Sequence, residues 1–164
     1  MDRLFTPWRY DYLVSDKAAG GCIFCEAYAA GADRERLIVF RGRTHFVILN
    51  RFPYNNAHLM IVPHRHLADL TEATAEERHE LMDLSARALA VLRSTYHAQG
   101  FNIGCNLGTI AGAGIAGHYH LHVVPRWEGD TNFMTVTAGT RVIPEDLDRS
   151  WERLREAFRA PEGS

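Results

Sequence analysis

Three histidines at alternate positions, His118, His120 and His122, are the residues of this sequence best suited to chemistry. Successive side chains of a β-strand point to opposite faces, so this spacing predicts three imidazoles on one face. Alternate strand residues lie roughly 6 to 7 Å apart, so neighbouring imidazoles can contact one ligand. The pattern is typical of a metal cluster or of a row of catalytic groups that act near neutral pH.

A stretch rich in glycine and alanine, residues 106–117, leads directly into the histidines. Glycine lets the backbone approach a ligand closely, and free amide N–H groups can hold phosphate oxygens without a lysine. The spacing matches neither the P-loop nor the dinucleotide-binding glycine pattern, which argues against an ordinary ATPase or dehydrogenase. We therefore predict a phosphate cradle beside the histidines. A neutral imidazole is a competent nucleophile toward phosphorus, and the middle residue, His120, has a histidine on each side.

Residues 118–126, which read HYHLHVVPR, are similar to the signature of the histidine-triad (HIT) family of nucleotide hydrolases and transferases. Residues 49–63 and 100–133 are similar to the bacterial branch of this family that includes diadenosine tetraphosphate phosphorylases. The resemblance covers most of the chain. It implies an α+β fold built on an antiparallel sheet, usually assembled as a homodimer.

The resemblance also implies roles for individual residues. His120 matches the family nucleophile, which forms a nucleotidyl-histidine intermediate, and His122 matches the residue that contacts the phosphate and the leaving group. Asn50 matches a ribose-binding residue, and Asn106 matches a phosphate-contacting one. Many relatives carry a glutamine where this chain has Gly114, so phosphate binding falls to backbone amides here. The amides that we expect to bind phosphate are those of Gly112, Ala113 and Gly114.

A C-x-x-C pair, Cys22 and Cys25, suggests metal or redox use. In zinc-bearing relatives the first motif histidine binds a structural zinc together with such a pair and one more histidine. Tetrahedral zinc accepts two thiolates and two imidazoles. The ligands implied here are Cys22, Cys25, His66 and His118. His64 is a rival to His66, and we favour His66 because family members place the ligand three residues after the proline. No organic cofactor is expected.

Composition restricts the partners. The chain has 164 residues with 18 basic and 20 acidic side chains, so no bulk charge favours nucleic acid or a membrane surface. The N-terminus has no apolar signal region, and no apolar run approaches the roughly 18 residues of a membrane span. We therefore expect a cytoplasmic protein whose small anionic ligand, a nucleotide or dinucleotide and in some reactions inorganic phosphate, is held locally.

The elements that position these residues follow from periodicity. A capping box at Thr74 and Glu77 opens a long helix that we expect to run to Gly100, and Pro144 opens a C-terminal helix. Short β-rich runs at 37–40, 45–49, 58–62, 101–106 and 133–137 and the triad segment predict an antiparallel sheet of about five strands. We thus predict one α+β domain over 1–164, divided into an N-terminal arm (1–35), a core (36–137) and a C-terminal helix and tail (138–164).

Several functions are compatible with these residues. The leading hypothesis is cleavage of dinucleoside polyphosphates at the α-phosphate through His120, with phosphate or water as the acceptor. A nucleoside phosphoramidase would use the same triad. The alternatives from other classes are a three-histidine metal centre that activates water and a zinc-containing nucleotide-binding module without turnover.

Overall fold

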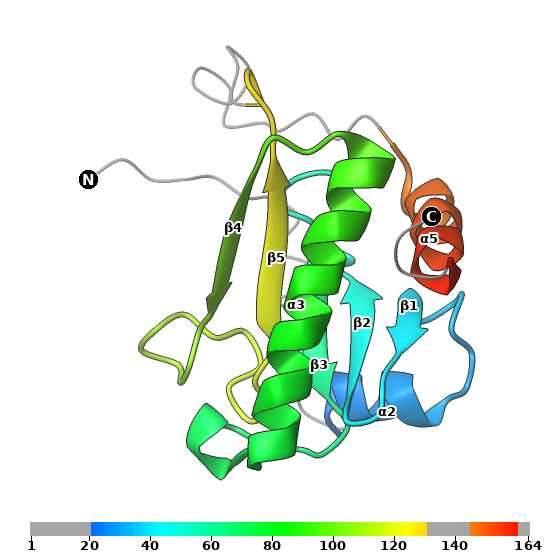
Figure 1. The fold of residues 1–164 in the computed structure, drawn as a ribbon. Helices are drawn as coiled ribbons and strands as arrows, with labels where there is room; N and C mark the ends of the chain where they lie inside the picture. The colour runs from blue at the N-terminus through cyan, green and yellow to red at the C-terminus, as the bar shows by residue number, and fades with distance from the viewer. Residues whose placement is uncertain (1–20, 131–144, 161–164) are drawn as a thin grey trace.

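The computed structural model describes residues 21–130 and 145–160, and they form an α+β fold around a five-stranded antiparallel sheet (Figure 1). The strands lie in the order β1-β2-β3-β5-β4. Their bounds are β1 (Ile38–Arg41), β2 (His45–Leu49), β3 (Leu59–Pro63), β4 (Gly100–Cys105) and β5 (Leu121–Arg126). The predicted fold class is confirmed, while the expected strand at 133–137 lies outside the described residues.

The register of the sheet brings distant segments together at the triad. Strand β5 lies between β3 and β4 in the sheet, and a long loop connects β4 to β5 in the chain. His122 on β5 is paired with Met60 on β3 and with Gly104 on β4. Residues near the start of β3 therefore lie beside the motif, even though they are about 60 positions away in the sequence.

The long helix α3 (Ala75–Tyr96) packs across one face of the sheet (Figure 1). Its predicted capping box is present: the Thr74 side chain accepts from the Glu77 amide, and the Glu77 carboxylate accepts from the Thr74 amide. The expected end at Gly100 is wrong. The helix ends at His97, which adopts the left-handed conformation with φ 52°, and Gly100 already belongs to β4.

Two shorter helices, α2 and α5, and the 3₁₀ turn η1 (Leu70–Glu72) complete the fold of the described residues. Helix α5 (Leu147–Arg159) starts after the N-cap Asp146, and not at Pro144 as expected. It packs against β1, where the Trp151 indole donates to the Ile38 carbonyl at 2.9 Å. Part of the region predicted as an arm is helix α2 (Ile23–Ala29), whose Phe24 and Ala27 are buried in the core.

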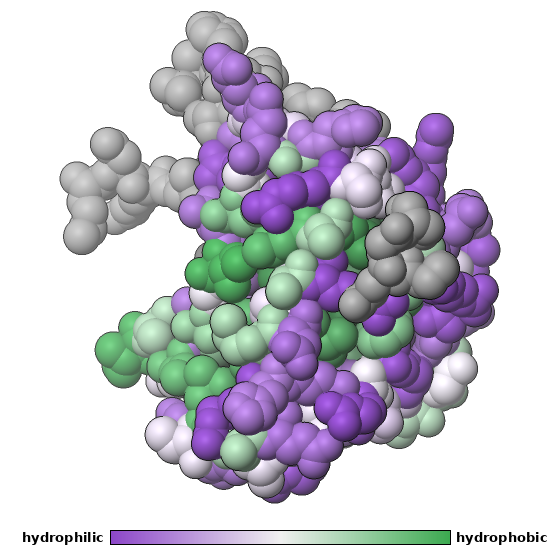
Figure 2. All heavy atoms as spheres, in the orientation of Figure 1, coloured by the Kyte–Doolittle hydropathy of each residue, from purple (hydrophilic) through white to green (hydrophobic). Residues whose placement is uncertain are grey.

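Strand β4 forms one edge of the sheet, and among the described residues it pairs with β5 alone. Figure 2 shows apolar side chains along the side of the molecule where β4 and the following loop lie. Ile103 on β4 is 46% exposed, which is unusual for a large apolar residue in a sheet. No helix among the described residues is long and apolar enough to cross a membrane.

Candidate active site and metal centre

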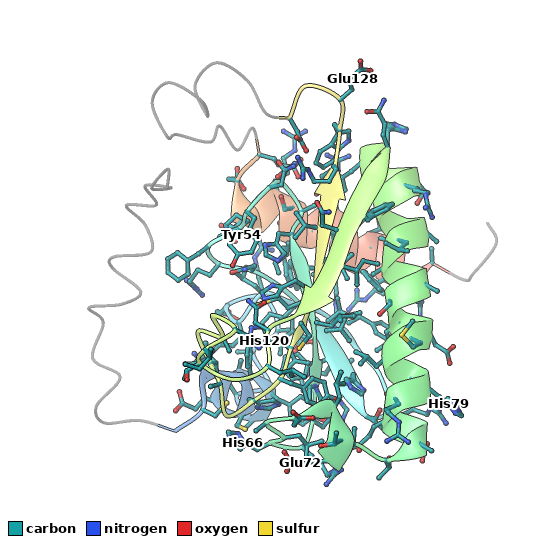
Figure 3. All side chains as sticks on the ribbon, turned by 90° about the vertical axis from the view of Figure 1, so that its left-hand side faces the viewer. Tyr54, His66, Glu72, His79, His120 and Glu128 are labelled. Atoms are coloured by element: carbon teal, nitrogen blue, oxygen red, sulfur yellow. The ribbon has the colours of Figure 1, made fainter. Side chains whose placement is uncertain are left out.

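The triad segment alternates as the sequence predicted, but only its last histidine lies in the regular strand. Strand β5 begins at Leu121, so that His118 and His120 precede it. Tyr119 points into the core and is 1% exposed. The Phe24 ring of α2 packs against His118 and His120, with ring centroids 5.6 and 5.0 Å apart. Figure 3 shows the labelled His120 in the middle of this side of the molecule, between Tyr54 and His66.

His120 has its tautomer fixed by the backbone. Its Nδ1 lies 3.0 Å from the carbonyl oxygen of His118, and a carbonyl oxygen only accepts. Burial lowers the pKa of His120, and its ring is 6% exposed, so the neutral form dominates at neutral pH. The proton of this neutral ring therefore lies on Nδ1. Its Nε2 keeps a lone pair, as a nucleophile requires.

His122 receives the opposite tautomer through His58. The backbone N–H of Tyr54 donates to His58 Nδ1 at 3.1 Å, so His58 carries its proton on Nε2. That N–H lies 2.9 Å from His122 Nδ1 and donates to it. Burial, with the neighbouring His122 and His120, lowers the pKa of His58 to about 3, which keeps the ring neutral. His122 is then protonated on Nε2, and its ring centroid lies 4.9 Å from that of His120.

A cavity of about 570 Å³ opens beside these rings, which is large enough for a nucleotide. Side chains of α2, β2 and β3 make much of its wall apolar. His120, His122, Asn50 and Asn106 supply polar groups to the same cavity, so the structure brings together four of the residues that the sequence singled out. The apolar wall includes Ile23, Phe24, Ala27, Leu37, Ile48 and Met60.

The amides of the glycine-rich loop differ from the prediction. Gly112 donates its N–H to Thr109 at 3.0 Å, and Ala113 donates to Gly108 at 3.2 Å, because the loop closes its own turn. Gly114 lines the cavity, and its amide has no hydrogen-bond partner among the described residues. Gly112 also lines the cavity, although its amide, like that of Ala113, is engaged within the loop, and phosphate binding by these residues stays a prediction.

Asn50 lies between the strand end and the histidines. Its Oδ1 accepts from the Phe52 amide at 3.0 Å, and its Nδ2 lies 3.3 Å from His58 Nδ1. These contacts hold the amide group at the edge of the cavity, where it can meet a ribose hydroxyl. Asn106 follows the end of β4 and approaches the cavity from the other side.

A second group of donors lies next to the triad. One donor atom from each of the four predicted ligands, Cys22, Cys25, His66 and His118, lies within 4.8 Å of the other three. His118 Nδ1 is 3.2 Å from Cys22 Sγ, and His66 Nδ1 is 3.4 Å from Cys25 Sγ. Tetrahedral zinc with bonds of about 2.3 Å to sulfur and about 2.0 Å to nitrogen separates such donors by about 3.5 Å. The residues therefore fit zinc.

The surroundings of His118 support the same conclusion. Its Nε2 lies 2.9 Å from the Pro63 carbonyl and donates to it, which leaves Nδ1 with a lone pair toward the two cysteines. Burial and the adjacent Cys22 raise the pKa of the Cys25 thiol, and a divalent cation would counter that effect. The Nδ1 of His118 thus faces the cysteines, although His118 shares its motif with His120 and His122.

Two other histidines can now be placed. The rival ligand His64 does not join the cluster, and its ring stacks on Tyr28 with centroids 4.3 Å apart. His45 is buried in the core. His58 is also buried, and sequence reasoning missed its contact with His122. The only sequence signal was that His58 starts an apolar run, and its partner His122 follows from the register of β3 with β5.

Comparison with known proteins gives a consistent result. Residues 33–129 match the model of the HIT domain. The chain is 41% identical to the AP-4-A phosphorylase of Mycobacterium tuberculosis H37Rv over 162 residues, which covers 94% of this chain and 82% of the relative. It is similar in structure to a Zn-bound histidine triad family protein from Mycobacterium smegmatis, with 30% identity, a TM-score of 0.70 and coverage of 85% and 94%. The chain belongs to the HIT domain family.

Proposed function

We propose that this protein cleaves dinucleoside polyphosphates such as diadenosine tetraphosphate at an α-phosphate, by double displacement through His120. The observation that carries the proposal is the pair of opposite tautomers. His120 keeps a lone pair on Nε2, while His122 presents a proton on Nε2 beside it. Similarity to an AP-4-A phosphorylase over most of the chain supports the same substrate class.

The first half of the reaction follows from these atoms. His120 Nε2 attacks the α-phosphorus and forms a P–N bond, while the bond from that phosphorus to the bridging oxygen breaks. With diadenosine tetraphosphate the leaving group is ATP, and AMP remains on His120. The His122 Nε2–H can donate to the phosphate or to the departing oxygen, where negative charge accumulates in the transition state. The amide of Gly114 can stabilise the same charge.

In the second half an acceptor oxygen attacks the α-phosphorus and the P–N bond breaks, which restores His120. Inorganic phosphate would yield ADP, and water would yield AMP. The same residues serve both acceptors, so we propose the double displacement without a choice between them. Burial of His120 and the apolar wall of the cavity limit water access, which favours an acceptor held in the site.

The test is a product assay with diadenosine tetraphosphate, with and without phosphate, followed by nucleotide chromatography. ATP plus ADP identifies a phosphorylase, and ATP plus AMP identifies a hydrolase. His120→Ala should abolish turnover and the AMP adduct that intact-protein mass spectrometry detects after acid-free quenching. His79→Ala, on the exposed face of α3, is the matched control. Turnover by His120→Ala contradicts the mechanism, and cleavage of a nucleoside phosphoramidate alone favours the phosphoramidase instead.

We further propose that the cluster of Cys22, Cys25, His66 and His118 holds a structural zinc. Its fit rests on the donor set and the separations between the donor atoms. When bound, zinc would link α2 to the segment after β3 and to the triad, with no direct part in the reaction. Elemental analysis of the purified protein tests this proposal, and far less than one zinc per chain would contradict it.

We also propose a homodimer in which β4 pairs with a second copy. The exposed edge of β4 and the exposed Ile103 support this assembly, because an uncovered apolar edge strand favours pairing with another chain. Light scattering of the purified protein measures the mass directly.

A further inference from the structure

We propose that Tyr119 and His45 form a buried anchor that positions the His120 nucleophile from the core side of the triad segment. The inference deepens the proposed function and rests on it. Neither residue lines the cavity, so both act as positioning residues through His120.

Tyr119 is held at two points. Its backbone N–H donates to the Leu67 carbonyl at 2.7 Å, and its hydroxyl lies 3.0 Å from His45 Nε2. Tyr119 is 1% exposed and His45 is fully buried. A buried tyrosine hydroxyl needs a partner, and His45 on β2 provides it from across the core.

The hydrogen bonds behind Tyr119 run in one direction. The Thr44 hydroxyl donates to Glu80 Oε2, so its oxygen accepts from His45 Nδ1 at 2.9 Å. Although Glu80 Oε2 lies 3.6 Å from Nδ1, burial outweighs this carboxylate and lowers the pKa of His45. The ring is therefore neutral, with its proton on Nδ1. Its Nε2 accepts from the Tyr119 hydroxyl, so that the chain of donors ends on an anionic carboxylate.

The carboxylate at the end of this series of hydrogen bonds is itself held in place. Glu80, on α3, accepts from the amides of Arg43, Thr44 and His45 at 2.6, 2.5 and 3.0 Å. Burial opposes ionisation of Glu80, but the bond from the Thr44 hydroxyl and the amides of Arg43 and Thr44 outweigh it and lower the pKa of Glu80 to about 2. The Tyr119 hydroxyl is thus connected to a rigid junction between α3 and the start of β2.

The connection to the nucleophile is the peptide that joins His118 to Tyr119. Its carbonyl accepts the Nδ1 proton of His120 at 3.0 Å and thereby selects the tautomer with a free Nε2. The Tyr119 amide and hydroxyl contacts hold the nitrogen side of this peptide. Loss of the hydroxyl contact would let the peptide rotate, and the carbonyl would hold the His120 proton less well.

The test is Tyr119→Phe, with Tyr96→Phe as the matched control. Tyr96 is partly buried, and its hydroxyl donates to Glu145 at 2.7 Å, away from the cavity. Both substitutions should lower the melting temperature by a similar amount. A misplaced nucleophile should lower kcat of Tyr119→Phe by roughly tenfold and leave KM within about twofold, whereas Tyr96→Phe should keep kcat.

A spectroscopic measurement separates positioning from general loosening. Nitrogen-15 NMR of the imidazole rings reports which nitrogen of His120 carries the proton. We expect the Nδ1–H form in the wild type and in Tyr96→Phe, and a mixture of both tautomers in Tyr119→Phe. Equal kcat in the two variants, or an unchanged His120 tautomer in Tyr119→Phe, would overturn the proposal. If the wild type does not turn over dinucleotides, the proposed function fails, and the NMR comparison still decides whether the anchor sets the tautomer.

Discussion

A pair of substitutions at His58 tests whether this residue controls the tautomer of His122. His58→Asn keeps a polar atom where His58 Nδ1 meets the Tyr54 amide but cannot reach His122. His58→Gln places its amide nitrogen as many bonds from the backbone as His58 Nε2, so it can donate to His122 Nδ1. The two variants therefore separate the turn contact from the contact with the triad.

The size of the effect follows from one buried hydrogen bond. His58 is fully buried, and its bond to His122 is 2.9 Å long. An acceptor left without its donor in such a site costs about 1 to 3 kcal/mol. If that cost falls on the transition state, where the His122 proton is needed, kcat decreases by roughly 5- to 150-fold. We expect this loss in His58→Asn and a much smaller one in His58→Gln.

The assay is rapid-quench kinetics of ATP release and of adduct formation at His120, with dinucleotide at saturation. His58→Asn should slow adduct formation itself, because the proposed mechanism assigns to His122 the proton that assists departure of the leaving nucleotide. Thermal melts of both variants show whether a slow enzyme is still folded. Equal rates for a folded His58→Asn and His58→Gln would refute the tautomer argument.

Three further predictions follow from the structure. Folding lowers the pKa of His58 from 6.5 to about 3, so between these pH values the unfolded chain binds a proton that the folded protein does not. The free energy of unfolding should therefore decrease by about 3 kcal/mol from pH 6.5 to pH 4, and by less in His58→Gln. Urea unfolding at each pH measures this decrease. Cys25→Ser should lose zinc and raise KM, because the helix that carries this zinc ligand also places Ile23 and Phe24 in the cavity wall. Elemental analysis should find zinc retained in the control Cys105→Ser. Ile103→Asp should convert the dimer to a monomer in light scattering, and a monomeric wild type would exclude the proposed β4 pairing.

The long helix and the sheet were accessible from the sequence because their signals are local. The capping box at Thr74 and Glu77 needs four consecutive residues, and alternating histidines need five. The end of α3 was misplaced because His97 adopts a left-handed conformation, which glycine favours and histidine adopts only occasionally.

Helix α2 escaped prediction for a different reason. It has seven residues and no side-chain cap at Cys22, so little in its own sequence favours a helix. Its position comes from tertiary contacts, since Phe24 packs on two triad histidines, and the N-cap Cys22 and the helix residue Cys25 lie close to His66 and His118. Because distant residues stabilise α2, its own sequence shows no helical periodicity from which it could be predicted.

The three motif histidines have the same side chain but three different environments, and this difference explains why a row of histidines can divide its work. His118 gives its Nε2 proton to the Pro63 carbonyl, so Nδ1 is available to a metal. His120 gives its Nδ1 proton to the His118 carbonyl, and Nε2 is available to phosphorus. His122 accepts from His58 at Nδ1, so its own proton lies on Nε2. Each partner comes from the backbone or from β3 and its flanks, so the spacing of the motif predicts the row while the fold assigns the protons.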